Sequence, residues 1–283
     1  MQGPWNDAIT MKAAIGLRMG VIGAVIAGSI GLSGAQVIRI KGSDTLGAKL
    51  VPAIAEKYQA GKNPRPEFEI SAEGSSVAFP ALTNGTADIG MSSRKASAGE
   101  LAAAQAKGVK LTETVACHDM IVVVVNKSSK VKNLSKEQIM KIFTGATKDW
   151  SEVGGSPGPI SVYTRNTSSG TYKDWQKLAM GGRDYPSSSQ KLAGNEQIVQ
   201  EVAKNKNGIG YVGLAYAKAN GIKAVSIDGT QPVANNAKKY AYSRLCYFYA
   251  PDKPSAEAQA FMDFVESGAG QAIVSRVGFI PTK

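Results

Sequence analysis

Residues 160–181 read ISVYTRNTSSGTYKDWQKLAMG, and this stretch contains the unit that decides the fold. Its opening, ISVYTR, is rich in apolar and β-branched residues and predicts a strand, whereas NTSSG is small and polar and predicts a loop. From Thr171 onward, the spacing of apolar positions predicts a helix. A strand that leads through a short loop into a helix is the building block of α/β proteins.

The same unit recurs along most of the chain. Strands are predicted at VIRI (37–40), EFEIS (67–71) and ADIGMSS (87–93), and helical patterns alternate with them. Apolar residues at helical spacing, from Leu46 to Tyr58, predict one helix over 45–59, and a second predicted helix ends at Gly108. This alternation favours an α/β fold with mostly parallel sheets.

Two longer strands are predicted at 120–126 and 244–250. The first contains a continuous apolar run, MIVVVV, which is typical of a strand buried on both faces. The second lies near the C-terminal end, within YSRLCYFYAP. At these positions the chain could cross from one lobe to another and later return.

The first 35 residues have the pattern of a secretory signal peptide. Lys12 and Arg18 precede an apolar run over 19–32, and small residues follow up to Ala35. The run is shorter than the roughly 20 apolar residues that a membrane span needs, although a retained anchor is the alternative. The start is Met1 or Met11. We expect cleavage near Ala35 and a periplasmic protein, with no lipid anchor because no Cys follows.

The charge and the scarcity of metal ligands narrow the chemistry. The chain has a formal net charge of +11, and residues 36–283 keep +10. The positive residues are dispersed and not interleaved with aromatic residues, which favours a small anion over nucleic acid as the ligand. Only Cys117, Cys246 and His118 could supply sulfur or imidazole, too few for a His/Cys metal cage. The two cysteines can pair in an oxidising compartment, or can be buried as small apolar residues.

Polar side chains gather at four predicted strand ends, each leading toward a helix start. These are Ser43, Asp44 and Thr45; Ser75 and Ser76; Ser92, Ser93 and Arg94; and the segment from Arg165 to Thr171. Free N–H groups at a helix start stabilise an anion, and an Arg guanidinium matches phosphate or carboxylate. Each group taken alone is better explained as an ordinary helix cap or solvated turn. Together they predict a site for one tetrahedral anion.

These motifs carry a family resemblance that covers essentially all of the chain after residue 35. GSDTL, EGSS, ADIGMSSR, DMIVVVVN, IFTGATKDWSEVGG and RNTSSGT, in this order, resemble the phosphate-specific solute-binding proteins of ATP-driven importers. The resemblance implies the two-lobe periplasmic binding protein fold of type II, an α/β fold with mixed, mostly parallel sheets joined by two crossover strands. Lobe one would be 36–120 plus 247–283, and lobe two 124–243.

The resemblance also implies a ligand set and partners. The implied phosphate contacts are Thr45, Leu46 through its N–H, Ser75, Ser93, Arg94, Arg165, Ser169, Gly170 and Thr171. Some family members have Asp at the position of Ser93, where it accepts a proton from the ligand. That acceptor is open here, with Asp119 as the first candidate and Asp44 as the second, while we interpret Asp88 as structural. The expected protein is a monomer without cofactor or metal that delivers phosphate to an ABC permease in the inner membrane.

Two other functions compete with this one. The first is a binding protein for sulfate or molybdate, which a buried carboxylate facing the anion would distinguish from a phosphate binder. The second is a serine-type hydrolase, because Ser92 and Lys95 match S-x-x-K. The companion motifs of that class are missing, and no G-x-S-x-G follows residue 35, so we expect no enzyme. By the two-lobe analogy, Cys117 and Cys246 would flank the crossovers and could bridge.

Overall fold

The computed structural model of the protein describes residues 36–283, so the expected signal peptide and its cleavage site lie outside the described residues. The strands are β1 (Val37–Gly42), β2 (Glu67–Ser71), β3 (Ile89–Ser92), β4 (Leu111–Asn126), β5 (Asn133–Leu134), β6 (Ser161–Arg165), β7 (Gln190–Leu192), β8 (Gly208–Gly213), β9 (Ile222–Ala224), β10 (Ser226–Ile227) and β11 (Ser243–Pro251). The helices are α1 (Asp44–Gly47), α2 (Leu50–Gln59), α3 (Ser75–Thr83), α4 (Ala98–Ala106), α5 (Lys136–Phe143), α6 (Gly170–Leu178), α7 (Asn195–Lys204), α8 (Ala256–Glu266) and α9 (Gly268–Val277). Short 3₁₀ turns are η1 (Trp150–Val153), η2 (Leu214–Tyr216) and η3 (Ala234–Asn236).

Most strands form one mixed sheet, in the order β2-β1-β3-β11-β4-β8-β6-β7, with β9 paired to β4. β1 is parallel to both β2 and β3, and β6 is parallel to both β7 and β8. The antiparallel pairings all involve β4 or β11. The sheet therefore consists of two parallel halves, β1 to β3 and β6 to β8, joined by an antiparallel pair of long strands.

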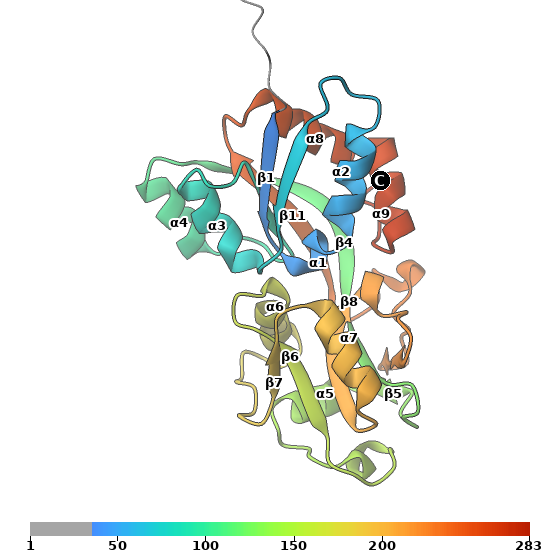
Figure 1. Ribbon diagram of the computed structural model, residues 1–283. Coiled ribbons are helices and arrows are strands. Elements are labelled where there is room, and N and C mark those ends of the chain that lie inside the picture. The colour runs from blue at the N-terminus through green and yellow to red at the C-terminus, as the bar shows by residue number, and fades with distance from the viewer. Residues whose placement is uncertain (1–35) are drawn as a thin grey trace, which may run out of the picture. The chain divides into compact units, whose positions relative to one another are not determined.

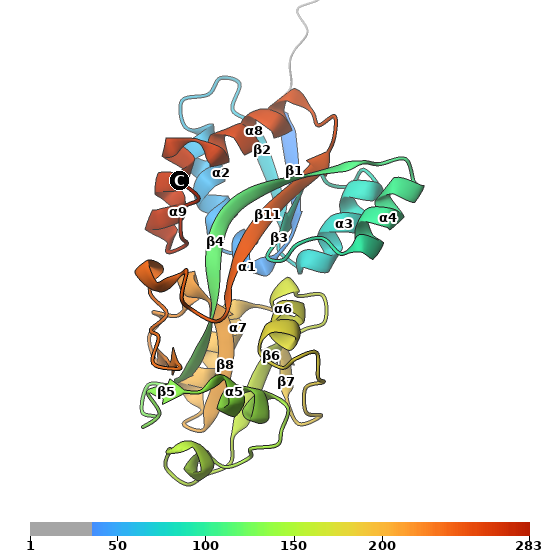
Figure 2. The same cartoon turned by 180° about the vertical axis from the view of Figure 1, so that it is seen from behind.

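The long strand β4 belongs to both halves of the sheet. Its first part, from Leu111 to Met120, pairs with β11, and its second part, from Ile121 to Val125, pairs with β8. All residues from Met120 to Val125 are fully buried, as the continuous apolar run predicted. Figure 2 shows β4 in green and β11 in orange running from one half to the other. The two long strands predicted at 120–126 and 244–250 are confirmed.

Helices cover the faces of both halves (Figure 1). In the half formed by β1 to β3, α2 packs with α8 and α9, and α3 packs with α4. In the other half, α7 packs against β8, β6 and β4. Phe143 and Trp150 are buried in this second half, which confirms that they are core residues. Within residues 36–283, no helix combines the length and the apolar character needed to cross a membrane.

The single helix predicted over 45–59 is wrong, because the structure divides this segment into α1 and α2. The break falls at Ala48 and Lys49, and Lys49 has non-helical backbone angles, φ −133 and ψ −53. In a continuous helix, Pro52 would lie in the interior and its ring would clash with the carbonyl of Ala48. The break places Pro52 in the first turn of α2, where proline is tolerated. Leu46, Leu50, Ile54 and Tyr58 are nevertheless all buried.

The two cysteines lie opposite each other on the crossover strands. Cys117 of β4 and Cys246 of β11 are register partners, and both are free thiols buried in the core. The expectation that the two-lobe arrangement brings them close together is confirmed, but they are not joined by a disulfide. Burial and the neighbouring Cys246 raise the pKa of the Cys117 thiol well above its ordinary value. A thiol in this environment is mostly protonated and unreactive at neutral pH.

Candidate anion-binding site

Four buried hydroxyls from separate parts of the chain meet at one place. The Oγ1 atoms of Thr45 and Thr171 are 3.0 Å apart, and Thr171 Oγ1 is 3.4 Å from Ser93 Oγ. Ser93 Oγ lies 3.2 Å from Ser75 Oγ. All four residues are at most 1% exposed. We call Thr45, Ser75, Ser93 and Thr171 the hydroxyl cluster, and it joins the starts of α1, α3 and α6 to the end of β3.

The start of α6 presents backbone N–H groups to this cluster. Ser169 is the N-cap, and its Oγ accepts a hydrogen bond from the Tyr172 N–H at 3.2 Å. The first N–H groups of a helix have no partner inside the helix, so those of Gly170 and Thr171 are available to a ligand. A Cβ atom on Gly170 would be 2.3 Å from Ser75 Oγ and 2.9 Å from Ser93 Oγ. Glycine therefore allows the backbone of α6 to touch hydroxyls that come from the other half of the sheet.

Arg165 is a buried guanidinium with spare donors. It ends β6 and is 1% exposed, and its Nη2 donates to the Ala193 carbonyl at 2.6 Å. Its Nη1 lies 3.2 Å from Asp44 Oδ1, but neither Nη1 nor Nε has a hydrogen-bond partner among the described residues. Burial lowers the pKa of Arg165, because the charged form is poorly solvated. An anion would satisfy both the charge and the unpaired donors.

Asp44 and Asn195 connect Arg165 to the hydroxyl cluster. Asp44 Oδ1 accepts hydrogen bonds from the Asn195 N–H at 2.9 Å and from its Nδ2 at 2.6 Å. The same Nδ2 lies 3.4 Å from Thr45 Oγ1, and Asn195 Oδ1 accepts the Gly213 N–H at 3.0 Å. Sequence reasoning missed Asn195. Its only signal was its position at the start of a helix, where Asn is common for local reasons.

Asp119 is fully buried and forms an ion pair with a residue that the sequence analysis did not select. Its Oδ2 accepts from Arg244 Nε at 3.1 Å and Nη2 at 2.8 Å, and its Oδ1 accepts the Leu214 N–H at 3.0 Å. Burial opposes the charge of Arg244, but the nearby Asp119 carboxylate raises the pKa of that guanidinium above its ordinary value. An Arg inside the apolar strand YSRLCYFYA was the available signal, because a buried charge requires a partner.

The surroundings of Asp119 place it close to the cluster. A Cβ on Gly213 would lie 3.0 Å from Thr45 Cγ2 and 3.3 Å from Asp119 Oδ2. The remaining donor of Arg244, Nη1, has no hydrogen bond among the described residues and lies 3.6 Å from Asp174 Oδ2. Burial raises the pKa of the Asp174 carboxyl group. Asp174 lies on α6, one turn after Thr171.

Arg94, which the resemblance implies as a phosphate contact, forms hydrogen bonds with protein groups. Its Nη1 and Nη2 donate to the two carboxylate oxygens of Glu100, at 2.8 Å and 2.6 Å. Nη1 also donates to the Lys95 carbonyl, and Nη2 to Ser76 Oγ at 3.4 Å. The contacts of this guanidinium are therefore made to Glu100, Lys95 and Ser76, and sequence reasoning missed Glu100. Only Nε of Arg94 is buried without a partner among the described residues.

Asp88 is structural, as interpreted from the sequence, but its partner is not local. Its Oδ2 accepts the Arg39 N–H at 2.8 Å and Arg39 Nε at 3.1 Å, and its Oδ1 accepts Arg39 Nη2 at 2.9 Å. The bond therefore ties the start of β3 to β1. Among residues 36–283, no group of three or more His, Cys, Asp and Glu side chains is placed to hold a metal ion.

The fold and the hydroxyl cluster together define a class of protein. It is the class of α/β binding proteins in which helix starts and hydroxyl groups can enclose a small anion. A family model for the PBP superfamily domain matches residues 29–268. The chain is 34% identical to the phosphate-binding protein PstS of Pseudomonas aeruginosa, over 85% of this chain and 81% of that protein. It is 30% identical to PstS of Bacillus subtilis, over 86% and 80% of the two chains.

Solved structures agree with these relatives. A crystal structure from Clostridium perfringens, described as a phosphate ABC transporter substrate-binding protein with bound phosphate, superposes with a TM-score of 0.81. The two sequences are 31% identical, and the match covers 88% of this chain and 100% of the Clostridium perfringens chain. The chain belongs to the PBP superfamily and, within it, to the phosphate ABC transporter substrate-binding proteins. The family resemblance and the type II periplasmic binding protein fold are confirmed.

Proposed function

We propose that this protein binds inorganic phosphate with high affinity and delivers it to the permease subunits of an ABC transporter in the inner membrane. The observation that carries the proposal is the hydroxyl cluster, which gathers donors from both halves of the sheet. Relatives named as phosphate-binding proteins, and a similar structure described with bound phosphate, support the same ligand. Sulfate and molybdate are not favoured, because none of these relatives is named for them.

In this proposal the anion lies between lobe one, 36–120 plus 247–283, and lobe two, 124–243. The hydroxyls of the cluster, the Ser169 hydroxyl and the N–H groups of Leu46, Gly170 and Thr171 supply neutral donors. Arg165 supplies charge through Nη1 and Nε, which have no other hydrogen-bond partner among the described residues. Arg94 acts at longer range, because its terminal nitrogens contact Glu100. Many neutral donors around one guanidinium hold an anion without fully neutralising it.

Asp119 is the carboxylate that we assign to accept the ligand proton. Phosphate keeps at least one proton at neutral pH, whereas sulfate has none. A carboxylate can accept about four hydrogen bonds, and Asp119 accepts three from protein donors. The remaining acceptor position of the Asp119 carboxylate can accept a hydrogen bond from a phosphate O–H. Sulfate has no O–H, so the same position would face only the lone pairs of a sulfate oxygen. Leaving a buried charge unpaired costs several kcal/mol, so this arrangement would select phosphate.

The proposal also covers the cellular context. We propose export to the periplasm with cleavage near Ala35, a monomeric state, no nucleic-acid partner and no enzymatic activity. The family consists of substrate-binding transport proteins, which supports the absence of catalysis. The +10 charge of residues 36–283 suits an anion, and the positive residues are not interleaved with aromatic residues, which supports a small one.

Calorimetric titration tests the function and the acceptor together. Protein stripped of ligand by unfolding and refolding is titrated with phosphate, sulfate and molybdate at pH 7. We expect tight binding of phosphate and no measurable heat from sulfate. In Asp119→Asn the discrimination against sulfate should fall, whereas in Asp44→Asn it should persist. If discrimination against sulfate falls in Asp44→Asn and persists in Asp119→Asn, the acceptor is Asp44. If the unmodified protein does not bind phosphate, the proposed function is refuted.

A further inference from the structure

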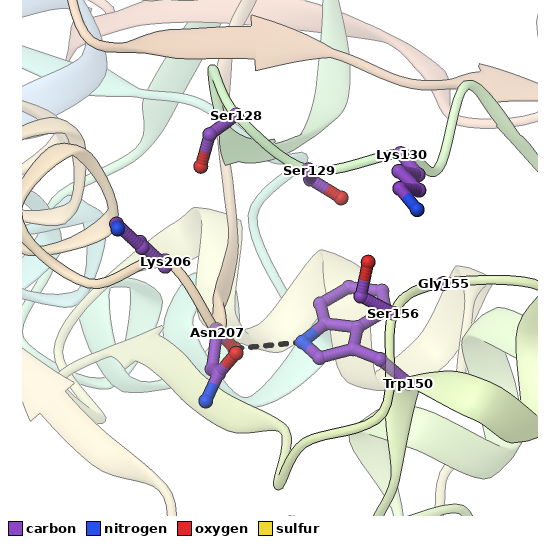
Figure 3. Close-up of a pocket in the computed structure, with 8 residues that line it drawn as sticks. All are labelled: Ser128, Ser129, Lys130, Trp150, Gly155, Ser156, Lys206 and Asn207. Carbon is purple, nitrogen blue, oxygen red and sulfur yellow. Dashed lines mark hydrogen bonds between the residues drawn. The ribbon is translucent and has the colours of Figure 1, made fainter.

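A polar cavity lies in lobe two, and none of its lining residues belongs to the hydroxyl cluster. Its volume is about 290 Å³, and it is lined by Ser128, Ser129, Lys130, Trp150, Gly155, Ser156, Lys206 and Asn207. These residues come from the loop after β4, from η1 and the loop that follows it, and from the turn before β8. Figure 3 shows Lys130 and Lys206 on opposite sides of the space, with Trp150 and Ser156 along one wall.

The lining of this cavity is positively charged and contains no acidic residue. Lys130 and Lys206 are the only ionisable side chains that line it, and neither forms a salt bridge with any residue of 36–283. Hydroxyls of three serines add neutral donors. Trp150 is held in place because its Nε1 donates to the Asn207 carbonyl at 3.0 Å. The wall formed by the indole is therefore fixed, while both ammonium groups are free to take a ligand.

The charge of the chain is concentrated in the same lobe. Residues 124–243 contain 17 Lys and Arg against 8 Asp and Glu, a net charge of +9. The remainder of 36–283 contains 14 against 13, a net charge of +1. One anion bound at the hydroxyl cluster does not account for this excess, because that cluster uses Arg165 alone from lobe two. A positive field of this size raises the local concentration of anions around the lobe.

One further lysine, Lys223, contacts a residue that lines the cavity. Lys223 donates from Nζ to the carbonyl of Ser129, a lining residue, and forms no salt bridge with the described residues. Burial, together with the nearby positive charge of Lys132, lowers the pKa of Lys223.

We propose that this cavity is a second anion-binding site, which takes a ligand with two linked phosphate groups, such as inorganic diphosphate or the end of a short polyphosphate chain. The cavity lies near the lower end of the volumes of small-molecule sites, and one orthophosphate ion would leave most of it empty. Lys130 and Lys206 lie on opposite sides of the cavity with serine hydroxyls between them, so each can turn its ammonium group toward one of two linked phosphoryl groups. Lysine binds phosphate as a point charge, without the fixed geometry that Arg imposes.

The test titrates the protein with inorganic diphosphate in the presence of orthophosphate. Orthophosphate at roughly 5 mM, far above the dissociation constant expected for tight binding, keeps the hydroxyl cluster filled. We expect saturable binding of one diphosphate, weakened by salt, with shifts of the Trp150 indole N–H signal in NMR spectra. Lys130→Gln/Lys206→Gln should weaken binding by about tenfold or more. The matched control, Lys191→Gln/Lys238→Gln, removes the same charge from exposed positions of the same lobe and should change affinity less than about twofold.

Either of two results would overturn the proposal. The first is that diphosphate does not bind when the hydroxyl cluster is filled, or that both double variants weaken diphosphate binding equally. This result would mean that lobe two attracts anions only through its non-specific positive charge. Binding to vesicles of anionic phospholipid without binding to diphosphate would assign the charge to a membrane surface. Orthophosphate affinity measured on the same variants should be unchanged. Because the two sites share no residue, failure here leaves the proposed phosphate function untouched.

Discussion

Single residues shape the candidate site both through the polar groups that they supply and through the side-chain atoms that they lack. Gly170 supplies only backbone, and this absence of a side chain lets the start of α6 meet Ser75 and Ser93. Arg165 supplies a charge, and its Nη1 and Nε have no hydrogen-bond partner among the described residues, although Nη1 lies 3.2 Å from Asp44 Oδ1. Each of these features would be lost by a single substitution, so each yields a direct prediction.

Gly170→Ala should weaken phosphate binding by at least about tenfold, because an added Cβ forces apart groups that must close on the anion. The new atom would be 2.3 Å from Ser75 Oγ, a distance that cannot be tolerated without movement. Titration calorimetry measures the effect. Gly99→Ala is the control, since a Cβ there meets nothing within 4 Å. Unchanged affinity in Gly170→Ala would show that the anion binds elsewhere.

Arg165→Ala should reduce phosphate affinity by about 1.5–3 kcal/mol, the usual cost of losing a charged hydrogen-bond partner. The dissociation constant of phosphate is again the measurement. Arg183→Ala is the matched control: it also lies in lobe two, but its contacts are with Met140 and Met180 rather than with the cluster. If both variants lose affinity equally, the role of Arg165 is only its contribution to net charge.

At the scale of elements, ion pairs determine how helices are held against strands. Arg94, just after β3, pairs with Glu100 in the first turn of α4, where Ser97 and Glu100 also form a capping box. Burial disfavours the charged form of Glu100, but hydrogen bonds from Arg94 and Ser97 outweigh it and lower the pKa of the carboxyl group. The bond therefore stabilises the folded state only while Glu100 is ionised.

The stability of the protein should therefore contain an acid-sensitive part that depends on Glu100. A carboxyl group with a lowered folded-state pKa stabilises above its unfolded pKa, and this stabilisation is lost as pH falls through the folded-state value. For Glu100 the loss should occur below about pH 4.5, the ordinary value. Melting temperatures from pH 7 to pH 3 should fall less steeply in Glu100→Gln, whose stability at pH 7 should be lower by about 0.5–1 kcal/mol. Parallel curves for both proteins would contradict the assignment.

At the scale of the whole molecule, the hydroxyl cluster depends on both halves of the sheet at once. Thr45, Ser75 and Ser93 come from the half with β1 to β3, and Thr171 comes from the half with β6 to β8. The strand β4 joins the two halves, because its first part pairs with β11 and its second part pairs with β8. A ligand that binds all four hydroxyls therefore links the two halves and binds only when both are folded.

Phosphate should raise the melting temperature in a concentration-dependent manner, because it binds the folded state alone. At a thousand times the dissociation constant, the gain is about 4.1 kcal/mol of unfolding free energy. Thermal melts over a range of phosphate concentrations measure this effect, with sulfate as the control salt. A separate melting transition for one half, unaffected by phosphate, would show that the site does not link them.

The local sequence determined the elements of this protein and the residues at their ends. Alternating apolar patterns predicted the strands and helices, since each element must bury one face, and the run MIVVVV predicted a strand buried on both faces. Hydroxyls and glycines at strand ends pointed to an anion, because helix starts have unpaired N–H groups there. Motifs in a fixed order then identified the family.

Only the tertiary structure decided which of these groups meet. The distance between Thr45 and Thr171, which are 126 residues apart, depends on how the two halves join, and no local pattern encodes it. The pairing of Asp119 with Arg244, 125 residues apart, follows from burial, because a buried charge takes whichever partner the fold brings within reach. Local propensity chooses elements one at a time, whereas a binding site is a set of contacts between elements, and those contacts exist only once the chain has folded.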